Sequence, residues 1–131
     1  MYKRVIPIIL LDGEDAVKTK SFKNPSYVGD PINILKIFNE KDADEIVFLD
    51  INKSRLGLPP DFDFLEELAS EAFIPCAYGG GISNLEQATK IFRIGFEKIV
   101  AQTSLLNSLF CNEVVEKYGR QALVGSIDIV D

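Results

Sequence analysis

Residues 73–94 read FIPCAYGGGISNLEQATKIFRI, and this stretch decides the fold. It joins an apolar run, Phe73–Ala77, through the glycine turn Tyr78–Ser83 to a helix-like segment, Asn84–Ile94. Backbone N–H groups in such a turn can point at one anion, because glycine permits close approach and the dipole of the next helix favours negative charge. The turn is therefore either a phosphate-binding turn or a tight strand-to-helix connection. Its spacing excludes the dinucleotide fingerprint and the P-loop, because no Gly-Lys-Ser/Thr follows.

Strand and helix patterns alternate on both sides of this stretch. The predicted strands are Arg4–Leu11, Glu45–Ile51, Phe73–Ala77, Lys98–Ala101 and Ala122–Ile129. The predicted helices are Pro31–Lys41, Asp61–Ala72, Asn84–Ile94 and Asn107–Tyr118. Nearly continuous apolar strands separated by helices are typical of a parallel sheet covered by helices. The sequence therefore predicts one α/β domain over residues 1–131, in the order βαβαβαβαβ.

Local signals set the ends and the inner faces of these helices. Asp30 and Pro31 predict an N-cap and a first turn, and Gly95 and Gly119 predict C-terminal caps. The apolar residues predicted to face the core from the first two helices are Ile34, Leu35, Ile37, Phe38, Phe64, Leu65 and Leu68. The polar stretch Asp12–Gly29 predicts a long loop, and long loops in compact domains are often functional.

Composition limits the classes of function open to the chain. The 131 residues are 47% hydrophobic, which suits one soluble domain, and no apolar run reaches the roughly 18 residues of a membrane span. The net charge of −6 argues against nucleic acid as a partner but permits a phosphorylated metabolite. No histidine is present, so histidine acid–base chemistry is excluded and a zinc site is not expected. We expect Cys76 and Cys111 to pack as small hydrophobic residues. We also expect that the protein binds no metal and no cofactor and that it is cytoplasmic.

Two aspartates end predicted strands in the same local pattern. Asp50 and Asp128 each lie within a Leu/Ile-Asp-Ile sequence. The carboxyl ends of parallel strands are where α/β sheets and barrels place their chemistry. A partly desolvated carboxylate there has a raised pKa suited to general acid–base catalysis. Either aspartate could instead cap a loop or the following helix.

Two further groups of polar residues are candidates for a site. Gln102–Ser104 follows a predicted strand and offers a hydroxyl and amides to the same phosphate as Gly81, unless it serves as an ordinary N-cap. Three charged residues stand at the amino ends of predicted strands: Arg4, Glu45 and Lys98. In a closed barrel that end is the far face from the active site. Their alternating signs permit an ion-pair ring, and the alternative is three unrelated surface charges.

A set of motifs in a fixed order carries a family resemblance. The motifs are Lys3-Arg4-Val5-Ile6, Gly29-Asp30-Pro31, Asp44–Ile51, Ile74-Pro75, Gly79-Gly80-Gly81-Ile82 and Ser126-Ile127-Asp128. Together they resemble the cyclase subunit of imidazole glycerol phosphate synthase, a lyase of histidine biosynthesis with a (β/α)₈ TIM barrel. The family cyclase receives ammonia from a glutaminase subunit and uses it to split and cyclise a ribulosyl-type bis-phosphate nucleotide. The resemblance therefore implies the N-terminal half of such a barrel, a phosphorylated substrate and a glutaminase partner.

The resemblance assigns roles by position. Asp128 matches the catalytic aspartate of strand five in the family. Three residues match charged positions that gate the ammonia passage: Arg4, Glu45 and Lys98. The residues expected to bind the substrate or its phosphate are Lys18, Asp50, Gly80, Gly81, Gln102 and Thr103. Gln102 stands where the family usually has asparagine, which keeps an amide.

Leu10 departs from the family pattern. The family has a second catalytic aspartate late in strand one, at the position of Leu10, and leucine cannot transfer a proton. Asp12 would share the inward face but lie about 6–7 Å further along, beyond hydrogen-bond reach of the same atom. We therefore expect two-carboxylate catalysis to be lost or rerouted. The pattern is similar to a divergent branch found with surface-polysaccharide genes, in which ammonia passes from a glutaminase to a sugar-amidating enzyme.

The length of the chain is the second departure. Family barrels have about 250 residues and eight strands, whereas this chain ends at Asp131, just beyond predicted strand five. We therefore expect a truncated half-barrel whose apolar strand edges are exposed, and two copies could associate to approximate a barrel. Because the second phosphate site of the family lies in the other half, we expect weak or absent cyclase turnover by this chain alone.

Overall fold

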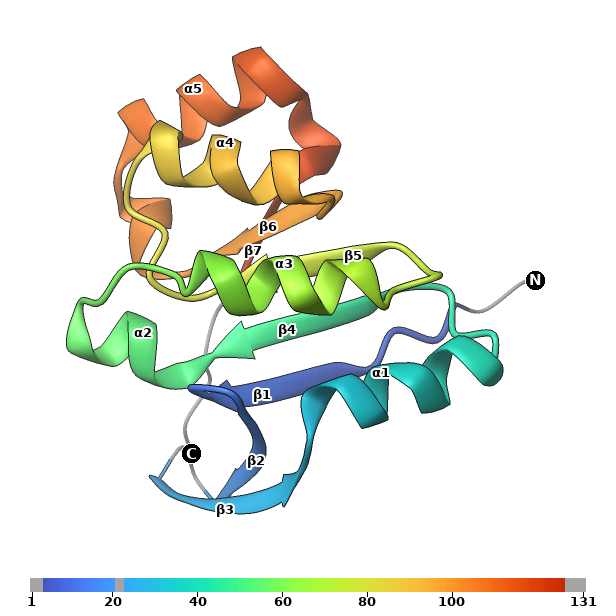
Figure 1. The fold of residues 1–131 in the computed structure, drawn as a ribbon. Helices are drawn as coiled ribbons and strands as arrows, with labels where there is room; N and C mark the ends of the chain where they lie inside the picture. The colour runs from blue at the N-terminus through green and yellow to red at the C-terminus, as the bar shows by residue number, and fades with distance from the viewer. Residues whose placement is uncertain (1–3, 21–22, 127–131) are drawn as a thin grey trace.

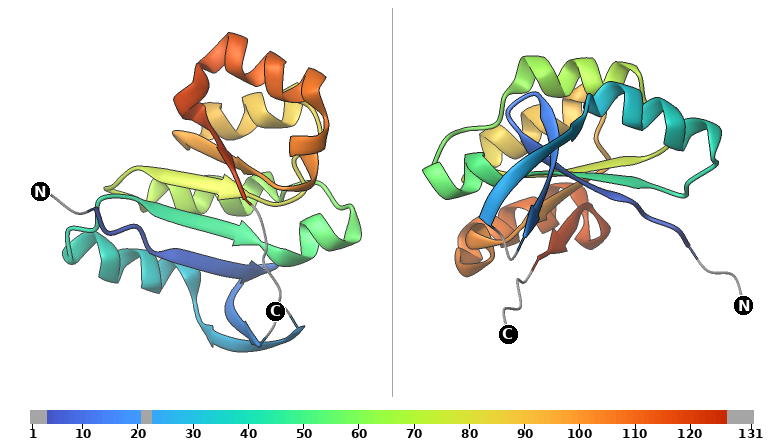
Figure 2. Two further views of the ribbon diagram at one scale, coloured as in Figure 1. Left: turned by 180° about the vertical axis from the view of Figure 1, so that it is seen from behind. Right: turned by 90° about the horizontal axis from the view of Figure 1, so that it is seen from below.

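The computed structural model describes residues 4–20 and 23–126 and shows one curved sheet with helices along one side (Figures 1 and 2). The strands are β1 (Ile8–Asp12), β2 (Asp15–Lys20), β3 (Lys23–Gly29), β4 (Ile46–Asp50), β5 (Cys76–Gly79), β6 (Lys98–Ala101) and β7 (Leu123–Gly125). The helices are α1 (Pro31–Glu40), α2 (Ile51–Leu56), α3 (Phe62–Ser70), α4 (Leu85–Ile94) and α5 (Ser108–Tyr118). Two 3₁₀ turns are η1 (Thr103–Leu106) and η2 (Arg120–Ala122).

The sheet has the order β3-β2-β1-β4-β5-β6-β7. Within the described residues, β1, β4, β5, β6 and β7 pair in parallel. Their register places one residue of each strand in a single row across the sheet: Leu10, Leu49, Gly79, Val100 and Val124. The predicted parallel α/β fold is confirmed, and it has the architecture of half of a (β/α)₈ barrel.

The core lies between the sheet and the helices on its outer side. Strand residues that alternate with the row above, such as Leu11, Phe48 and Tyr78, are fully buried there. Phe64, Leu65 and Leu68 of α3 pack against them as predicted. In α1, Leu35 is buried and Ile34 and Phe38 pack against the core.

The prediction that Ile37 of α1 faces the core is wrong. Ile37 is 52% exposed. It lies two positions after the buried Leu35, which turns its side chain by about 200° around the helix, because an α-helix has about 3.6 residues per turn. The other local signals of this helix hold: the carboxylate of Asp30 accepts the N–H of Ile32, and Pro31 opens the first turn.

The stretch predicted as a long loop, Asp12–Gly29, is instead the antiparallel pair β2–β3. The pairing of Asp12 with Asp15 leaves a two-residue turn that begins at Gly13, whose φ is 64°. A two-residue turn with positive φ is a strong hairpin connection. The predicted exposed edge at strand one is therefore wrong, because β2 pairs with β1 along that edge.

Some strand and helix bounds also differ from the prediction. The first strand begins at Ile8 rather than Arg4, and the third begins at Cys76 rather than Phe73, which is 85% exposed. The short helix α2 was not predicted; it begins directly after β4 and ends at Gly57, whose φ is 66°. The predicted fifth strand is seen as β7, and its last residues lie outside the described part of the chain.

Candidate functional site

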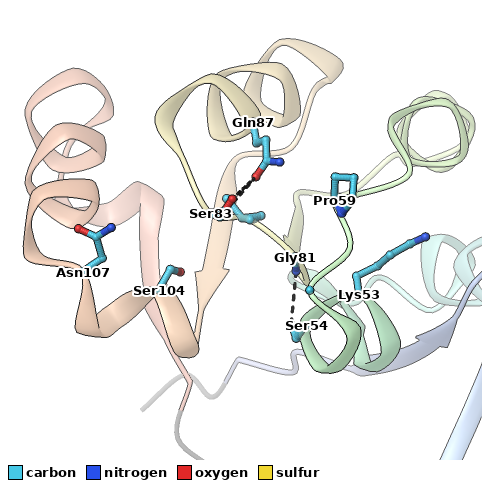
Figure 3. Close-up of a pocket in the computed structure, with 10 residues that line it drawn as sticks. Lys53, Ser54, Pro59, Gly81, Ser83, Gln87, Ser104 and Asn107 are labelled. Atoms are coloured by element: carbon cyan, nitrogen blue, oxygen red, sulfur yellow. Dashed lines mark hydrogen bonds between the residues drawn. The ribbon is translucent and has the colours of Figure 1, made fainter.

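A cavity of about 450 Å³ is lined by the segments that follow the carboxyl ends of β4, β5 and β6 (Figure 3). Its walls come from α2, from the glycine turn after β5 and from the first residues of α4 and of the η1–α5 segment. The polar residues that line it are Lys53, Ser54, Ser83, Gln87, Ser104 and Asn107. Sequence reasoning brought Gly81 and Ser104 to this place. It missed the contribution of α2, although a strand that runs directly into a helix must place that helix at the same edge.

The glycine turn forms one wall of this cavity. The N–H of Gly81 donates to Ser54 Oγ at 3.3 Å, and the Tyr78 hydroxyl donates to the carbonyl of Gly80 at 2.9 Å. A Cβ atom on Gly81 would lie 2.1 Å from the Leu58 carbonyl oxygen, and φ there is 73°. A Cβ on Gly80 would meet the backbone of Asp50 at 2.8 Å. The chain's own packing therefore requires glycine at both positions, independently of any ligand.

Asp50 lies at the end of β4, and its side chain caps α2. Oδ1 of Asp50 accepts the N–H groups of Asn52 and Lys53, each at 3.0 Å. The residue is buried, and burial raises the pKa of Asp50 above its ordinary value, although these two N–H donors act in the opposite direction. The capping interpretation of Asp50 is therefore confirmed, and its predicted place in substrate binding stays a prediction.

The site lacks a carboxylate at the position of Leu10, as the sequence requires. Because β1 extends to Asp12, Leu10 and Asp12 share one face of the sheet. The Asn52 side-chain amide donates to Asp12 Oδ1, and Arg55 donates to Asn52 Oδ1 at 2.7 Å. This chain of contacts holds the Asp12 carboxylate against α2.

At the opposite end of the strands, the three predicted charged residues meet. Glu45 Oε2 accepts from Arg4 at 3.4 Å and from Lys98 Nζ at 3.3 Å. The Glu45 side chain is 4% exposed, Lys98 is 27% exposed and Arg4 is 56% exposed. One buried carboxylate thus contacts both cations at the amino edge of β4 and β6. The interpretation of the three residues as unrelated surface charges is therefore wrong.

The remaining predicted residues are dispersed. Lys18 is exposed on β2. Gln102 precedes η1, and Thr103 begins it, next to the cavity-lining Ser104. Asp128 lies outside the described residues, so its predicted catalytic role stays a prediction.

The described residues add three observations. Cys76 is buried as expected, and burial raises the pKa of its thiol to about 12. No group of three or more Asp, Glu or Cys residues is arranged to hold a metal ion in residues 4–20 and 23–126. None of the helices in that range has the length and apolar character needed to cross a membrane.

Comparison with known proteins identifies the family. A family model described as "Histidine biosynthesis protein" matches residues 4–131. A relative from Pseudomonas aeruginosa, named "Putative imidazole glycerol phosphate synthase subunit hisF2", is 50% identical over 96% of this chain and 51% of its own length. A Vibrio vulnificus relative with the corresponding name hisF3 is 45% identical over 96% of this chain and 49% of its own.

A third relative carries the name without a numeral. The "Imidazole glycerol phosphate synthase subunit HisF" of Dictyoglomus thermophilum is 38% identical over 97% of this chain and 51% of its own length. The chain thus spans about half the length of the curated relatives it matches. With a family match over nearly all of its residues and the fold of half a (β/α)₈ barrel, the chain belongs to the histidine biosynthesis protein family.

Proposed function

We propose that the chain is the N-terminal half of a cyclase subunit of imidazole glycerol phosphate synthase. In this proposal a phosphorylated substrate binds at the carboxyl edge of the sheet, and ammonia from a glutaminase subunit enters at the amino edge. The relatives that carry this enzyme's name support the assignment. The glycine turn lines the cavity, and α4 and α5 begin beside it, so the positive ends of two helix dipoles favour a phosphate group there.

The buried Glu45 carries the proposal. A carboxylate that is 4% exposed and holds two cations at 3.3–3.4 Å is a closed polar contact at the amino end of an otherwise apolar sheet face. Next along β4 on this face lie Val47 and Leu49, with Leu10 beside them on β1. When a second half or a second copy covers this face, uncharged ammonia can cross it, whereas ammonium is disfavoured by the loss of hydration. One strand length, about 15 Å, separates Glu45 from the cavity edge.

In this proposal Asp128 acts as general acid or base, and Leu10 cannot assist it. We therefore expect weak or absent cyclase turnover by this chain alone. The test is consumption of the ribulosyl-type bis-phosphate nucleotide with free ammonium salt as the nitrogen source. Turnover at ordinary enzyme rates would contradict the expected impairment.

Leu10 favours a second candidate function, which is ammonia conduction to a separate sugar-amidating enzyme. Such a conduit needs the contact among Arg4, Glu45 and Lys98 but not a pair of catalytic carboxylates. Binding of a glutaminase subunit, with glutaminase activity stimulated and no cyclase turnover even after Leu10→Asp in a full-length context, would favour the conduit. A gain in cyclase turnover in that variant would favour the cyclase.

Self-association is a further part of the proposal. Apolar residues on or near the uncovered inner face are exposed, among them Val5, Ile8 and Val124. We expect two copies to cover this face mutually, because a sheet face that helices do not cover must find another apolar partner. Light scattering of the wild-type chain and of Ile8→Lys measures this, with a larger mass expected for the wild type. A strict, well-folded wild-type monomer would exclude the association.

A further inference from the structure

Tyr78 is the last residue before the three glycines of the turn, and packing of its ring does not explain why this position has a hydroxyl group. The residue is 1% exposed, and its ring meets Phe96 edge-on with 6.1 Å between ring centroids. Packing of the ring would be satisfied equally by phenylalanine. The hydroxyl instead donates to the carbonyl oxygen of Gly80 at 2.9 Å, within the buried interior. Burial raises the pKa of Tyr78 far above its ordinary value, so the hydroxyl stays protonated and remains a donor.

This hydrogen bond fixes the direction of one peptide group. The Gly80 carbonyl and the Gly81 N–H belong to the same planar peptide, so they point in opposite directions. Because the carbonyl points inward to Tyr78, the N–H points outward, to Ser54 Oγ at 3.3 Å (Figure 3). Ser54 and Gly81 both line the cavity, so this N–H lies at the cavity wall.

No side chain on either flanking residue restricts the rotation of this peptide. Glycine stands on both sides of it, with φ values of 136° at Gly80 and 73° at Gly81. Without Cβ atoms, the backbone can exchange the positions of carbonyl and N–H at low steric cost. The reversed peptide would present the negative end of its dipole to the cavity. An anion would then meet a carbonyl oxygen instead of a donor.

We infer that Tyr78 is a positioning residue for phosphate binding: its hydroxyl holds the Gly80–Gly81 peptide so that the Gly81 N–H faces the cavity as a donor. The inference rests on the proposed function, in which a phosphorylated substrate occupies this cavity. Ser54 Oγ accepts this N–H at 3.3 Å, which is a long contact. A phosphate oxygen replaces it, because charged acceptors make shorter and stronger hydrogen bonds.

The test compares Tyr78→Phe with the wild-type chain, with inorganic phosphate as the probe and the Gly81 amide followed by NMR. In the wild type, phosphate shifts the Gly81 amide resonance. In Tyr78→Phe we expect affinity for phosphate to fall about three- to tenfold, the worth of one hydrogen bond. We also expect exchange broadening at Gly80 and Gly81 without phosphate, as the peptide samples both directions. Tyr118→Phe is the matched control, because its hydroxyl donates to Thr89 Oγ1 at 3.1 Å, away from the turn.

Unchanged phosphate affinity with a sharp Gly81 resonance in a folded Tyr78→Phe overturns the inference. If phosphate does not shift the Gly81 amide resonance of the wild type, the proposed phosphate site is wrong. Exchange broadening in Tyr78→Phe without phosphate still decides whether the hydroxyl orients the peptide. If Tyr78→Phe does not fold, the wild type decides: exchange broadening at Gly80 and Gly81 without phosphate would show that the hydroxyl does not hold the peptide and overturns the inference, whereas sharp resonances and a phosphate-dependent shift of the Gly81 amide support it.

Discussion

The two edges of the parallel sheet differ in the chemical groups that they present. The carboxyl edge presents backbone groups, hydroxyls, amides and the side chain of Lys53 around a cavity, and its acidic residues Asp50 and Asp12 cap or contact α2. The amino edge is made of charged side chains, with one buried carboxylate between two cations. The first edge depends on backbone geometry, and the second depends on charge. Substitutions at the two edges should therefore fail for different reasons.

The largest expected effect is at the carboxyl edge. Gly81→Ala should lower the free energy of unfolding by about 3 kcal/mol, because left-handed strain adds to a clash with backbone that cannot move aside. The clashing atom is the Leu58 carbonyl oxygen, 2.1 Å from the new Cβ. Urea denaturation measures the loss.

Gly57→Ala is a matched control for this substitution. Its φ is 66°, close to that of Gly81, but a Cβ there would meet no atom within 4 Å. It should therefore cost only the left-handed strain, about 1 kcal/mol. Equal losses at the two glycines would show that close packing does not define this edge.

The second effect is at the amino edge. Glu45→Gln should cost about 2 kcal/mol, because an amide cannot replace a charged acceptor shared by Arg4 and Lys98. Thermal or urea unfolding at low and high salt measures it. The control is Glu71→Gln, which removes an exposed pair with Lys36 at 4.0 Å and should cost less than about 0.5 kcal/mol. Similar losses for the two variants would remove the distinction between a buried and a surface charge.

The smallest effect concerns the cap at Asp50. Asp50→Asn should change stability little at pH 7, since asparagine caps as well as aspartate, while Asp50→Ala should cost about 1 kcal/mol. Burial raises the pKa of Asp50 above the ordinary 3.8. The folded state therefore holds this proton more tightly, and the contribution of Asp50 to stability falls as pH rises through 3.8 to the raised pKa.

Asp50→Asn removes that dependence. Measured by urea unfolding from pH 3.5 to pH 7, its stability relative to the wild type should rise with pH. A relative stability that falls over this range would mean that the N–H donors of α2, and not burial, determine the direction in which the pKa of Asp50 is shifted.

Sequence reasoning succeeded where a local signal and the fold agree. Asp30, Gly95 and Gly119 cap helix ends in the structure as predicted. It failed at Asp12–Gly29, where polar composition concealed a hairpin whose one clear signal was Gly13 in a two-residue turn. In that segment, strand formation depends on pairing with β1, which no local pattern contains.

The candidate site was predictable in parts. Position at strand ends located the glycine turn and brought Arg4, Glu45 and Lys98 together. The part played by α2 was missed, because α2 is held in place by contacts with residues far away in the sequence: Asn52 donates to Asp12, and Ser54 accepts from Gly81, which lies 27 residues away. The direction of the Gly80–Gly81 peptide likewise depends on a hydroxyl that the sequence shows only as one more aromatic residue.

The β2–β3 hairpin also limits how copies of the chain can assemble. It covers the edge of β1 and moves the free edge to β3, which contains Pro25, a residue without a backbone N–H, and pairs with β2 through irregular register. Such an edge is a poor template for another strand. Growth of one sheet onto the next through this edge is therefore disfavoured, so the pair of copies proposed above would form through the sheet face and not through open-ended growth from β3.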